Sequence, residues 1–265
     1  MPALIFDCDG VLADTERDGH RPAFNQTFAD VGLPVRWSEQ EYGEKLKIGG
    51  GKERMASLLT GDFVREHGLP PDAESQKELL ADWHRRKTAI YTEMVRAGRL
   101  PARPGIARVV DDAIAAGWKL SVASTSAEPS VRAVLEHAVG AEAAARFAVY
   151  AGDIVPAKKP HPAIYLAALE GLGVAAGDAI VIEDSRNGLL AAAGAGLRCL
   201  VTVNGYTREE AFDEAVLVVS ELGDPDRPPI EVLANRGRAR PGHHVTLDDL
   251  RACVGSGPTE GGGTG

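Results

Sequence analysis

The chain has 265 residues, of which 44% are hydrophobic and 25% are charged. This length and composition are typical of a globular protein with an α/β core and a smaller second domain. Its net charge of −9 disfavours nucleic acid and anionic membranes as partners, and no apolar run approaches the roughly 20 residues of a membrane span.

Short apolar runs, rich in Val, Ile, Leu or Ala, alternate with helical patterns along most of the chain. Runs of this length and composition are expected for strands buried on both faces of a sheet. The expected strands are Ala3–Phe6, Leu120–Ala123, Phe147–Tyr150, Ala179–Ile182, Cys199–Val203 and Val216–Val219. Helices are expected to begin at Ile106 and Pro162 and to span Asn187–Ala195. This alternation predicts a parallel sheet with helices on both faces.

Residues 16–99 interrupt the alternation, because they contain helical patterns and no convincing strand. The expected helices are His20–Val31, Ser38–Leu46, Lys52–Leu59 and Ser75–Ala97. We therefore expect a core of residues 1–15 and 100–223 and a helical cap of residues 16–99. The cap would lie over the C-terminal ends of the strands, where open parallel sheets bind ligands.

Residues 224–265 are expected to form an irregular, exposed extension, because proline pairs and an arginine-rich run replace the earlier periodicity. Within it, Thr246–Val254 could form a short capped helix. The glycine-rich end, residues 255–265, is expected to be disordered.

Two pairs of acidic residues follow expected strands, Asp7 with Asp9 and Glu183 with Asp184. Asp7 and Asp9 are two residues apart, and in an extended segment such residues face the same side. Carboxylates this close repel one another unless a cation or a shared proton intervenes, and a hard divalent cation prefers such oxygen ligands. The alternatives are a surface Asp-Gly turn for the first pair and a helix N-cap for the second.

Two further strand ends carry groups suited to an anion. Ser124 and Thr125 end the strand at Leu120–Ala123 and offer hydroxyl and backbone N–H groups to a phosphate, although such residues also cap helices. Lys159 lies in a loop before a helix, where it could neutralise phosphate charge or be a solvated surface residue.

Taken in chain order, these groups read acid pair, hydroxyl, lysine, acid pair. With this order the sequence resembles the haloacid dehalogenase superfamily over residues 3–222, while the tail after Gly223 is unmatched. A closer resemblance is to the CbbY-like sugar-phosphate phosphatases of bacteria and plastids. It is carried by Asp18–Arg21, Tyr42–Met55, Ala151–Asp153 and Asn204–Thr207. The resemblance implies a Rossmann-like core, Mg²⁺ as cofactor, and a substrate such as xylulose 1,5-bisphosphate.

The resemblance also implies roles for these residues. Asp7 would attack phosphorus and form an aspartyl-phosphate, and Asp9 would act as acid and then base. Ser124 and Lys159 would hold the phosphate oxygens, with Thr125 beside them. The Mg²⁺ ligands would be Asp7, the Asp9 carbonyl and Asp184, with Glu183 orienting a metal-bound water. His161 departs from the family, which often has Asp there.

The cap contains a candidate site for a second anion. Gly50, Gly51 and Lys52 lead into an expected helix, and free N–H groups beside a lysine suit an anion, although a flexible turn also fits. Glu16 and His20 lie near the first hinge and could contact the sugar or be solvated positions on a helix. A second anion site predicts a bisphosphate substrate.

Other functions remain open at this point. A phosphomutase of the beta-phosphoglucomutase type shares every core residue, and a non-catalytic sugar-phosphate-binding module is the alternative outside enzymes. Three widely separated cysteines, Cys8, Cys199 and Cys253, argue against a zinc site or disulfides and fit a reducing compartment. The N-terminus offers no targeting signal. We expect a cytoplasmic monomer, or a stromal one if the chain is a processed plant form.

Overall fold

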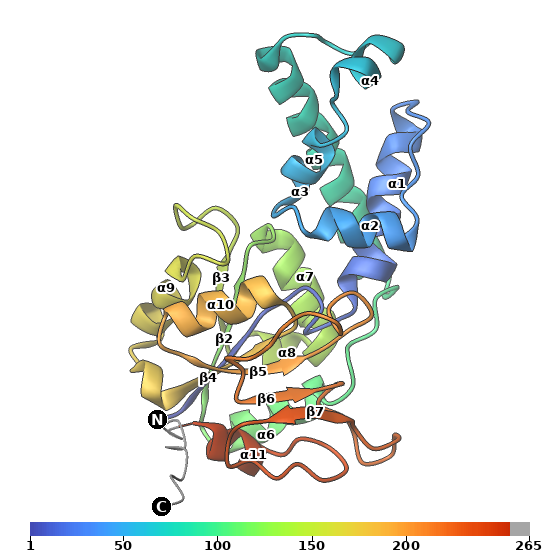
Figure 1. Cartoon of the computed structure of the whole chain (residues 1–265). Helices are drawn as coiled ribbons and strands as arrows, with labels where there is room; N and C mark the ends of the chain where they lie inside the picture. The colour runs from blue at the N-terminus through green and yellow to red at the C-terminus, as the bar shows by residue number, and fades with distance from the viewer. Residues whose placement is uncertain (255–265) are drawn as a thin grey trace, which may run out of the picture. The chain divides into compact units, whose positions relative to one another are not determined.

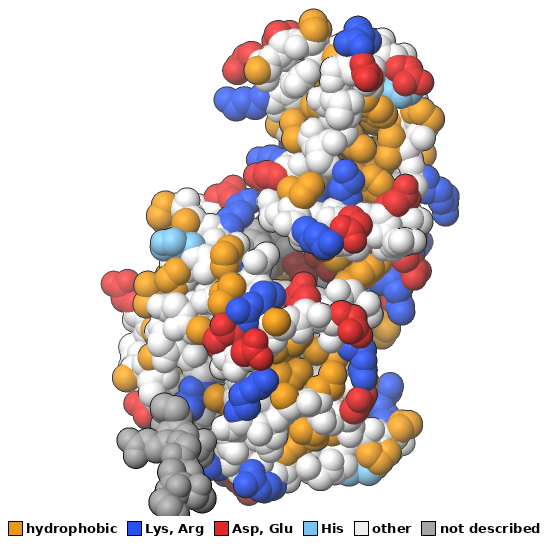
Figure 2. Space-filling view, in the orientation of Figure 1, with side chains coloured by type: hydrophobic (Ala, Val, Ile, Leu, Met, Phe, Trp, Pro, Cys, Tyr) orange, Lys and Arg blue, Asp and Glu red, His pale blue; other side chains and the backbone are white. Residues whose placement is uncertain are grey.

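The computed structural model describes residues 1–254 and divides into two compact units (Figure 1). One unit comprises Met1–Asp14 and the chain from Pro101 onward, and the other comprises Thr15–Leu100. Within residues 1–254, every helix is too short or too polar to cross a membrane. Figure 2 shows acidic and basic side chains interspersed on the face that it draws.

The first unit is built on a seven-stranded sheet with the order β3-β2-β1-β4-β5-β6-β7. All neighbours pair in parallel except β6 and β7, which are antiparallel. The first six strands confirm the predicted strands to within one residue at each end. They are β1 (Ala3–Phe6), β2 (Lys119–Ser124), β3 (Phe147–Ala151), β4 (Ala179–Glu183), β5 (Arg198–Thr202) and β6 (Leu217–Val219).

Helices cover both faces of this sheet, which confirms the predicted α/β class. On one face, Ala3 and Ile5 belong to a buried cluster with Ile164 and Leu189, which lie on α9 (Ala163–Leu172) and α10 (Arg186–Gly194). The other face is covered by α6 (Ile106–Ala115) and α7 (Glu128–Val139). A short helix α8 (Ala141–Ala144) and a 3₁₀ turn (Ala176–Asp178) complete the connections.

The register of the central strands aligns their C-terminal ends. Phe6 of β1 pairs with Val122 of β2 on one side and with Ile182 of β4 on the other. The residues that follow these three positions therefore emerge at one edge of the sheet. That edge receives Asp7 and Asp9 from β1, Ser124 from β2, and Glu183 with Asp184 from β4.

Most of residues 224–254 are irregular, as predicted, but parts of this tail are buried and it contains one strand that was not predicted. Val232–Asn235 form the edge strand β7, and Leu247–Cys253 form the expected helix, α11. Val245, Leu250 and Cys253 are fully buried, and Val245 N–H donates to the Leu222 carbonyl at 2.8 Å. The predicted disorder of residues 255–265 lies outside the described residues.

The second unit contains only helices, as its sequence patterns predict. They are a π-helical turn (Glu16–His20), α1 (Arg21–Asp30), α2 (Glu39–Leu46), α3 (Gly51–Ala56), α4 (Gly61–Glu66) and α5 (Ala73–Arg96). Phe24, Phe28, Trp37 and Tyr42 pack as an aromatic core. Helix α3 ends three residues earlier than predicted, and α4, which begins after its Thr60 N-cap, was not predicted.

Candidate active site

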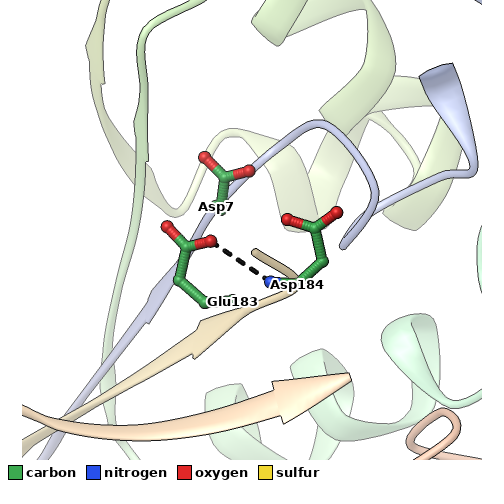
Figure 3. Close-up of side chains that lie close together, drawn as sticks. All are labelled: Asp7, Glu183 and Asp184. Atoms are coloured by element: carbon green, nitrogen blue, oxygen red, sulfur yellow. Dashed lines mark hydrogen bonds between the residues drawn. The ribbon is translucent and has the colours of Figure 1, made fainter. Parts of the chain in front are cut away.

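Three buried carboxylates meet at the C-terminal edge of the sheet (Figure 3). Asp7 follows β1, Glu183 ends β4, and Asp184 comes next; each offers a carboxylate oxygen within 4.8 Å of the others. Their exposed fractions are 8%, 0% and 6%. Carboxylates so close and so far from water repel one another strongly, so this arrangement requires positive charge.

Lys159 supplies part of that charge. Its Nζ atom donates hydrogen bonds of 2.6 Å to Asp7 Oδ1 and 2.6 Å to Glu183 Oε1, and one of 3.0 Å to the Ala123 carbonyl. Burial alone would lower the pKa of Lys159, but the charges of Asp7 and Glu183 outweigh burial and raise it. The lysine therefore stays protonated and links the ends of three strands.

One lysine does not balance the acids around it. Burial, together with the charges of Glu183 and Asp9, raises the pKa of Asp7 to about 7, although Lys159 acts to lower it. A divalent cation would remove this penalty, and an all-oxygen donor set is the kind that Mg²⁺ prefers. The residues present therefore fit a magnesium ion.

Both carboxylate oxygens of Glu183 accept hydrogen bonds from the protein. Oε1 accepts from Lys159 and from the Tyr165 hydroxyl. Oε2 accepts from the Asp184 N–H at 3.2 Å and from the Ser185 hydroxyl at 3.5 Å. This arrangement suits a group that orients its neighbours, and Tyr165 is a contributor that sequence reasoning missed.

Asp9 is held by a hydroxyl that the sequence did not single out. The Ser126 hydroxyl donates to Asp9 Oδ2, and the Ser126 N–H donates to Ser124 Oγ at 3.1 Å. Ser124 is 1% exposed at the end of β2, and Thr125 lies half-buried between the two serines. The hydroxyl segment and the first acid pair are thus in direct contact.

Two glycines make room for the acids. Gly10 has φ +80°, and a Cβ atom there would lie 2.0 Å from Asp184 Oδ2. A Cβ atom on Gly188, in the first turn of α10, would lie 1.9 Å from the Glu183 carboxyl carbon. Asn204, another residue outside the predicted set, donates to Asp184 Oδ2 at 2.7 Å. The loops around the acids are therefore closely packed.

In the helical unit, Glu16 takes part in a small polar cluster. Glu16 Oε2 accepts a 2.5 Å hydrogen bond from the Tyr42 hydroxyl and lies 3.6 Å from Arg54 Nη1. Arg54 also donates to the Tyr42 hydroxyl at 3.2 Å. Tyr42 and Arg54 fall within the stretch that carries the family resemblance, yet neither was predicted as a site residue.

His20 lies inside the helical unit and is only 5% exposed. Its Nδ1 atom is 2.7 Å from Lys87 Nζ, and its ring stacks on Tyr91 with the centroids 4.0 Å apart. Sequence reasoning missed Lys87, because it occurs within the regular pattern of a long helix.

The predicted anion-site residues of the helical unit lie at the start of α3. Gly50 has φ +96° and is the N-cap of α3, which starts at Gly51 and is six residues long. Lys52 is exposed. The positive side chain that makes polar contacts near this turn is Arg54, whose Nε donates to the Ile48 carbonyl at 3.0 Å.

Comparisons with known proteins agree with this geometry. The family model for haloacid dehalogenase-like hydrolases matches residues 1–196. The chain is 48% identical over 223 residues to the CBBY-like protein of Arabidopsis thaliana, a match covering 84% of this chain and 70% of that protein. It is 42% identical over 256 residues to Protein CbbY, plasmid, of Cupriavidus necator, which covers 93% of this chain and 98% of that protein.

A more distant relative and a solved structure are also similar to this chain. The phosphoglycolate phosphatase of Rhodospirillum rubrum is 31% identical over 229 residues, covering 84% of this chain and 90% of that protein. The crystal structure of a CbbY mutant from Rhodobacter sphaeroides, in complex with xylulose-(1,5)bisphosphate, has a TM-score of 0.73 and 40% identity. It covers 83% of this chain and 95% of that chain.

The comparison with the Cupriavidus protein corrects one expectation about the tail. A match over 93% of 265 residues includes residues beyond Gly223, where no likeness was expected. The match therefore includes the residues that form β7.

Proposed function

Because this chain belongs to the haloacid dehalogenase-like hydrolase family and is a phosphatase, we propose that it hydrolyses a sugar bisphosphate through an aspartyl-phosphate on Asp7. The observation that carries the proposal is the contact of Lys159 with both Asp7 and Glu183. Phosphoryl transfer requires a nucleophile, a cation that stabilises the phosphate and an acid/base. Asp7, the protonated Lys159 and Asp9 can supply these three groups.

Asp7 and Asp184 would hold Mg²⁺ with the Asp9 backbone carbonyl, and Glu183 would act through its contacts to Lys159 and Asp184. When bound, Mg²⁺ offsets the repulsion between the attacking carboxylate and the phosphate. Lys159 supplies the same sign of charge from the protein itself, because its side chain, which is only 9% exposed, remains protonated. Ser124 and the N–H groups after it offer donors to the phosphate oxygens.

Asp7 and Asp9 take different roles because their environments differ. Lys159 holds Asp7 Oδ1 and so fixes the carboxylate that attacks phosphorus. Asp9 accepts from Ser126, which orients it to protonate the leaving alkoxide and then to take a proton from the water that cleaves the aspartyl-phosphate. The water attacks phosphorus, so that Asp7 is regenerated and inorganic phosphate is released.

The substrate is proposed to carry a second phosphate. Support comes from the Rhodobacter CbbY mutant, whose structure contains xylulose-(1,5)bisphosphate. Within the helical unit, Arg54 and Lys87 are the cations in polar contact with Glu16 and His20, respectively. We therefore extend the proposed sugar contacts from Glu16, His20, Gly50, Gly51 and Lys52 to these two residues.

A phosphate-release screen with Mg²⁺ tests this function. The substrates are xylulose 1,5-bisphosphate, ribulose 1,5-bisphosphate, fructose 1,6-bisphosphate and hexose monophosphates, each with and without a chelator. We expect the highest kcat/KM for a pentulose bisphosphate. Preference for a hexose monophosphate would contradict the substrate class, and isomerisation without net phosphate release would identify a phosphomutase instead.

A further inference from the structure

The guanidinium of Arg103 donates hydrogen bonds to backbone carbonyl groups of three separate segments of the sheet unit. Nη1 donates to the Gly10 carbonyl and, at 3.0 Å, to the Thr202 carbonyl. Nη2 donates to the Val203 carbonyl at 2.7 Å and to the Ser220 carbonyl at 2.6 Å. The Arg103 backbone N–H adds a bond of 3.0 Å to the Leu12 carbonyl.

One of these segments adjoins an acid of the candidate site, and another adjoins a residue that binds one. Gly10 directly follows Asp9. Thr202 and Val203 directly precede Asn204, whose side chain donates to Asp184 Oδ2 at 2.7 Å. The two segments are also packed tightly against each other, because a Cβ atom on Gly10 would lie 2.9 Å from Asn204 Nδ2 and 2.0 Å from Asp184 Oδ2.

Arginine is the side chain suited to this position, because converging carbonyl oxygens repel one another unless donors lie between them. A planar guanidinium offers five N–H donors in a fixed geometry, whereas a lysine ammonium offers three N–H donors from a single atom. Burial lowers the pKa of Arg103, while Asp184, Asp14 and Glu221 act in the opposite direction. The guanidinium thus lies near acids that favour its charge, although burial opposes it more strongly.

We propose that Arg103 is a positioning residue of the active site, which locks the Asp9–Gly10 turn to the segment that orients Asp184. It touches no reacting atom, and its effect on turnover rests on the proposed function. Loss of the guanidinium would let the two segments separate, so that Asp9 and Asp184 no longer keep their places relative to Asp7.

Arg108 provides a matched control. It is also partly buried, and its guanidinium donates to the Leu222 and Gly223 carbonyls and lies 3.4 Å from Asp224. None of these contacts reaches the segments around Asp9 or Asp184. Arg108→Met therefore removes an arginine that binds backbone carbonyls in the same unit but away from the site. It measures the effect of such a loss on stability alone.

The test compares Arg103→Met, Arg103→Lys and Arg108→Met with the wild type in three measurements. The first is kcat and KM for xylulose 1,5-bisphosphate with Mg²⁺. The second is hydrogen exchange of the amides of Gly10, Leu12 and Asn204. The third is recovery of activity in Arg103→Met on adding millimolar guanidinium, which can re-enter the space left by the side chain.

Both Arg103 variants are expected to lose about 100-fold in kcat, the scale of a 1 Å misplacement of catalytic groups, with a much smaller change in KM. Exchange of the three amides should accelerate in both, and guanidinium should restore part of the activity of Arg103→Met. Arg108→Met should keep kcat and the exchange rates of those amides while unfolding at a lower temperature.

The proposal is overturned if the folded Arg103→Lys protein keeps wild-type kcat and exchange, or if Arg108→Met loses as much kcat as the Arg103 variants. An inactive wild type would instead refute the proposed function. In that case hydrogen exchange still decides the role of Arg103, because it requires no turnover.

Discussion

Gly188→Ala is expected to disable the site through Glu183. The new Cβ atom would lie 1.9 Å from the Glu183 carboxyl carbon and 2.0 Å from both oxygens, whereas ordinary contact begins near 3.4 Å. The carboxylate would therefore have to shift by roughly 1.5 Å, away from Lys159, Tyr165 and the Asp184 N–H. A displacement of ~1 Å can cost about 100-fold in rate, and overpacking costs ~1–3 kcal/mol in stability.

Gly194→Ala is the matched control, because Gly194 is in the same helix and its added Cβ atom would lie 3.4 Å from Pro162. This change should be neutral or stabilising by up to ~1 kcal/mol, the gain of alanine over glycine in a helix. The assays are kcat with Mg²⁺ and urea unfolding of each variant. Wild-type activity in Gly188→Ala, or equal losses in both variants, would refute the reasoning.

Three further predictions concern protonation and hydrogen bonding. Without Mg²⁺, the melting temperature should fall as pH rises from about 4 to 7, because burial raises the pKa of Asp7 from 3.8 to about 7. Between these pH values the folded state keeps a proton that the unfolded chain has released. Asp7→Asn or added Mg²⁺ should flatten this slope, and an unchanged slope in Asp7→Asn would contradict it. Ser126→Ala should lower kcat about tenfold with little change in KM, since a hydrogen bond to a charged group contributes ~1.5–3 kcal/mol; an unchanged kcat would argue against the role of Ser126 on Asp9. Burial raises the pKa of the Cys8, Cys199 and Cys253 thiols, so native protein at pH 8 should react slowly with a thiol reagent and only unfolded protein should react fast.

The sheet was predictable because strands buried on both faces are apolar runs that stop at polar residues. In β1 and β4 the stopping residues are themselves the acids of the site, so locating each strand end also located Asp7 and Glu183. The chain order of the acids, hydroxyls and lysine resembles that of the haloacid dehalogenase family, and this resemblance implied that Lys159 lies with them. This inference needs no knowledge of side-chain contacts.

Other features depend on contacts between distant segments and leave no local pattern. Ser124 and Ser126 are equivalent by residue type, and only the fold shows that Ser126 donates to Asp9. The four residues of β7 include an exposed valine and end in asparagine, so the strand is defined by its pairing with β6. Arg103 precedes Pro104-Gly105 in a loop, and its partners lie about 100 residues away in the chain.

The central claim is that Asp7 is the nucleophile, and Asp7→Asn tests it most directly beside Asp178→Asn, an exposed aspartate of the same unit. Phosphate release from xylulose 1,5-bisphosphate with Mg²⁺ is measured for both, and acid-quenched wild type is digested to find the phosphorylated peptide. We expect no release from Asp7→Asn, wild-type release from Asp178→Asn, and phosphate on the peptide that contains Asp7. Substantial release by Asp7→Asn would contradict the account.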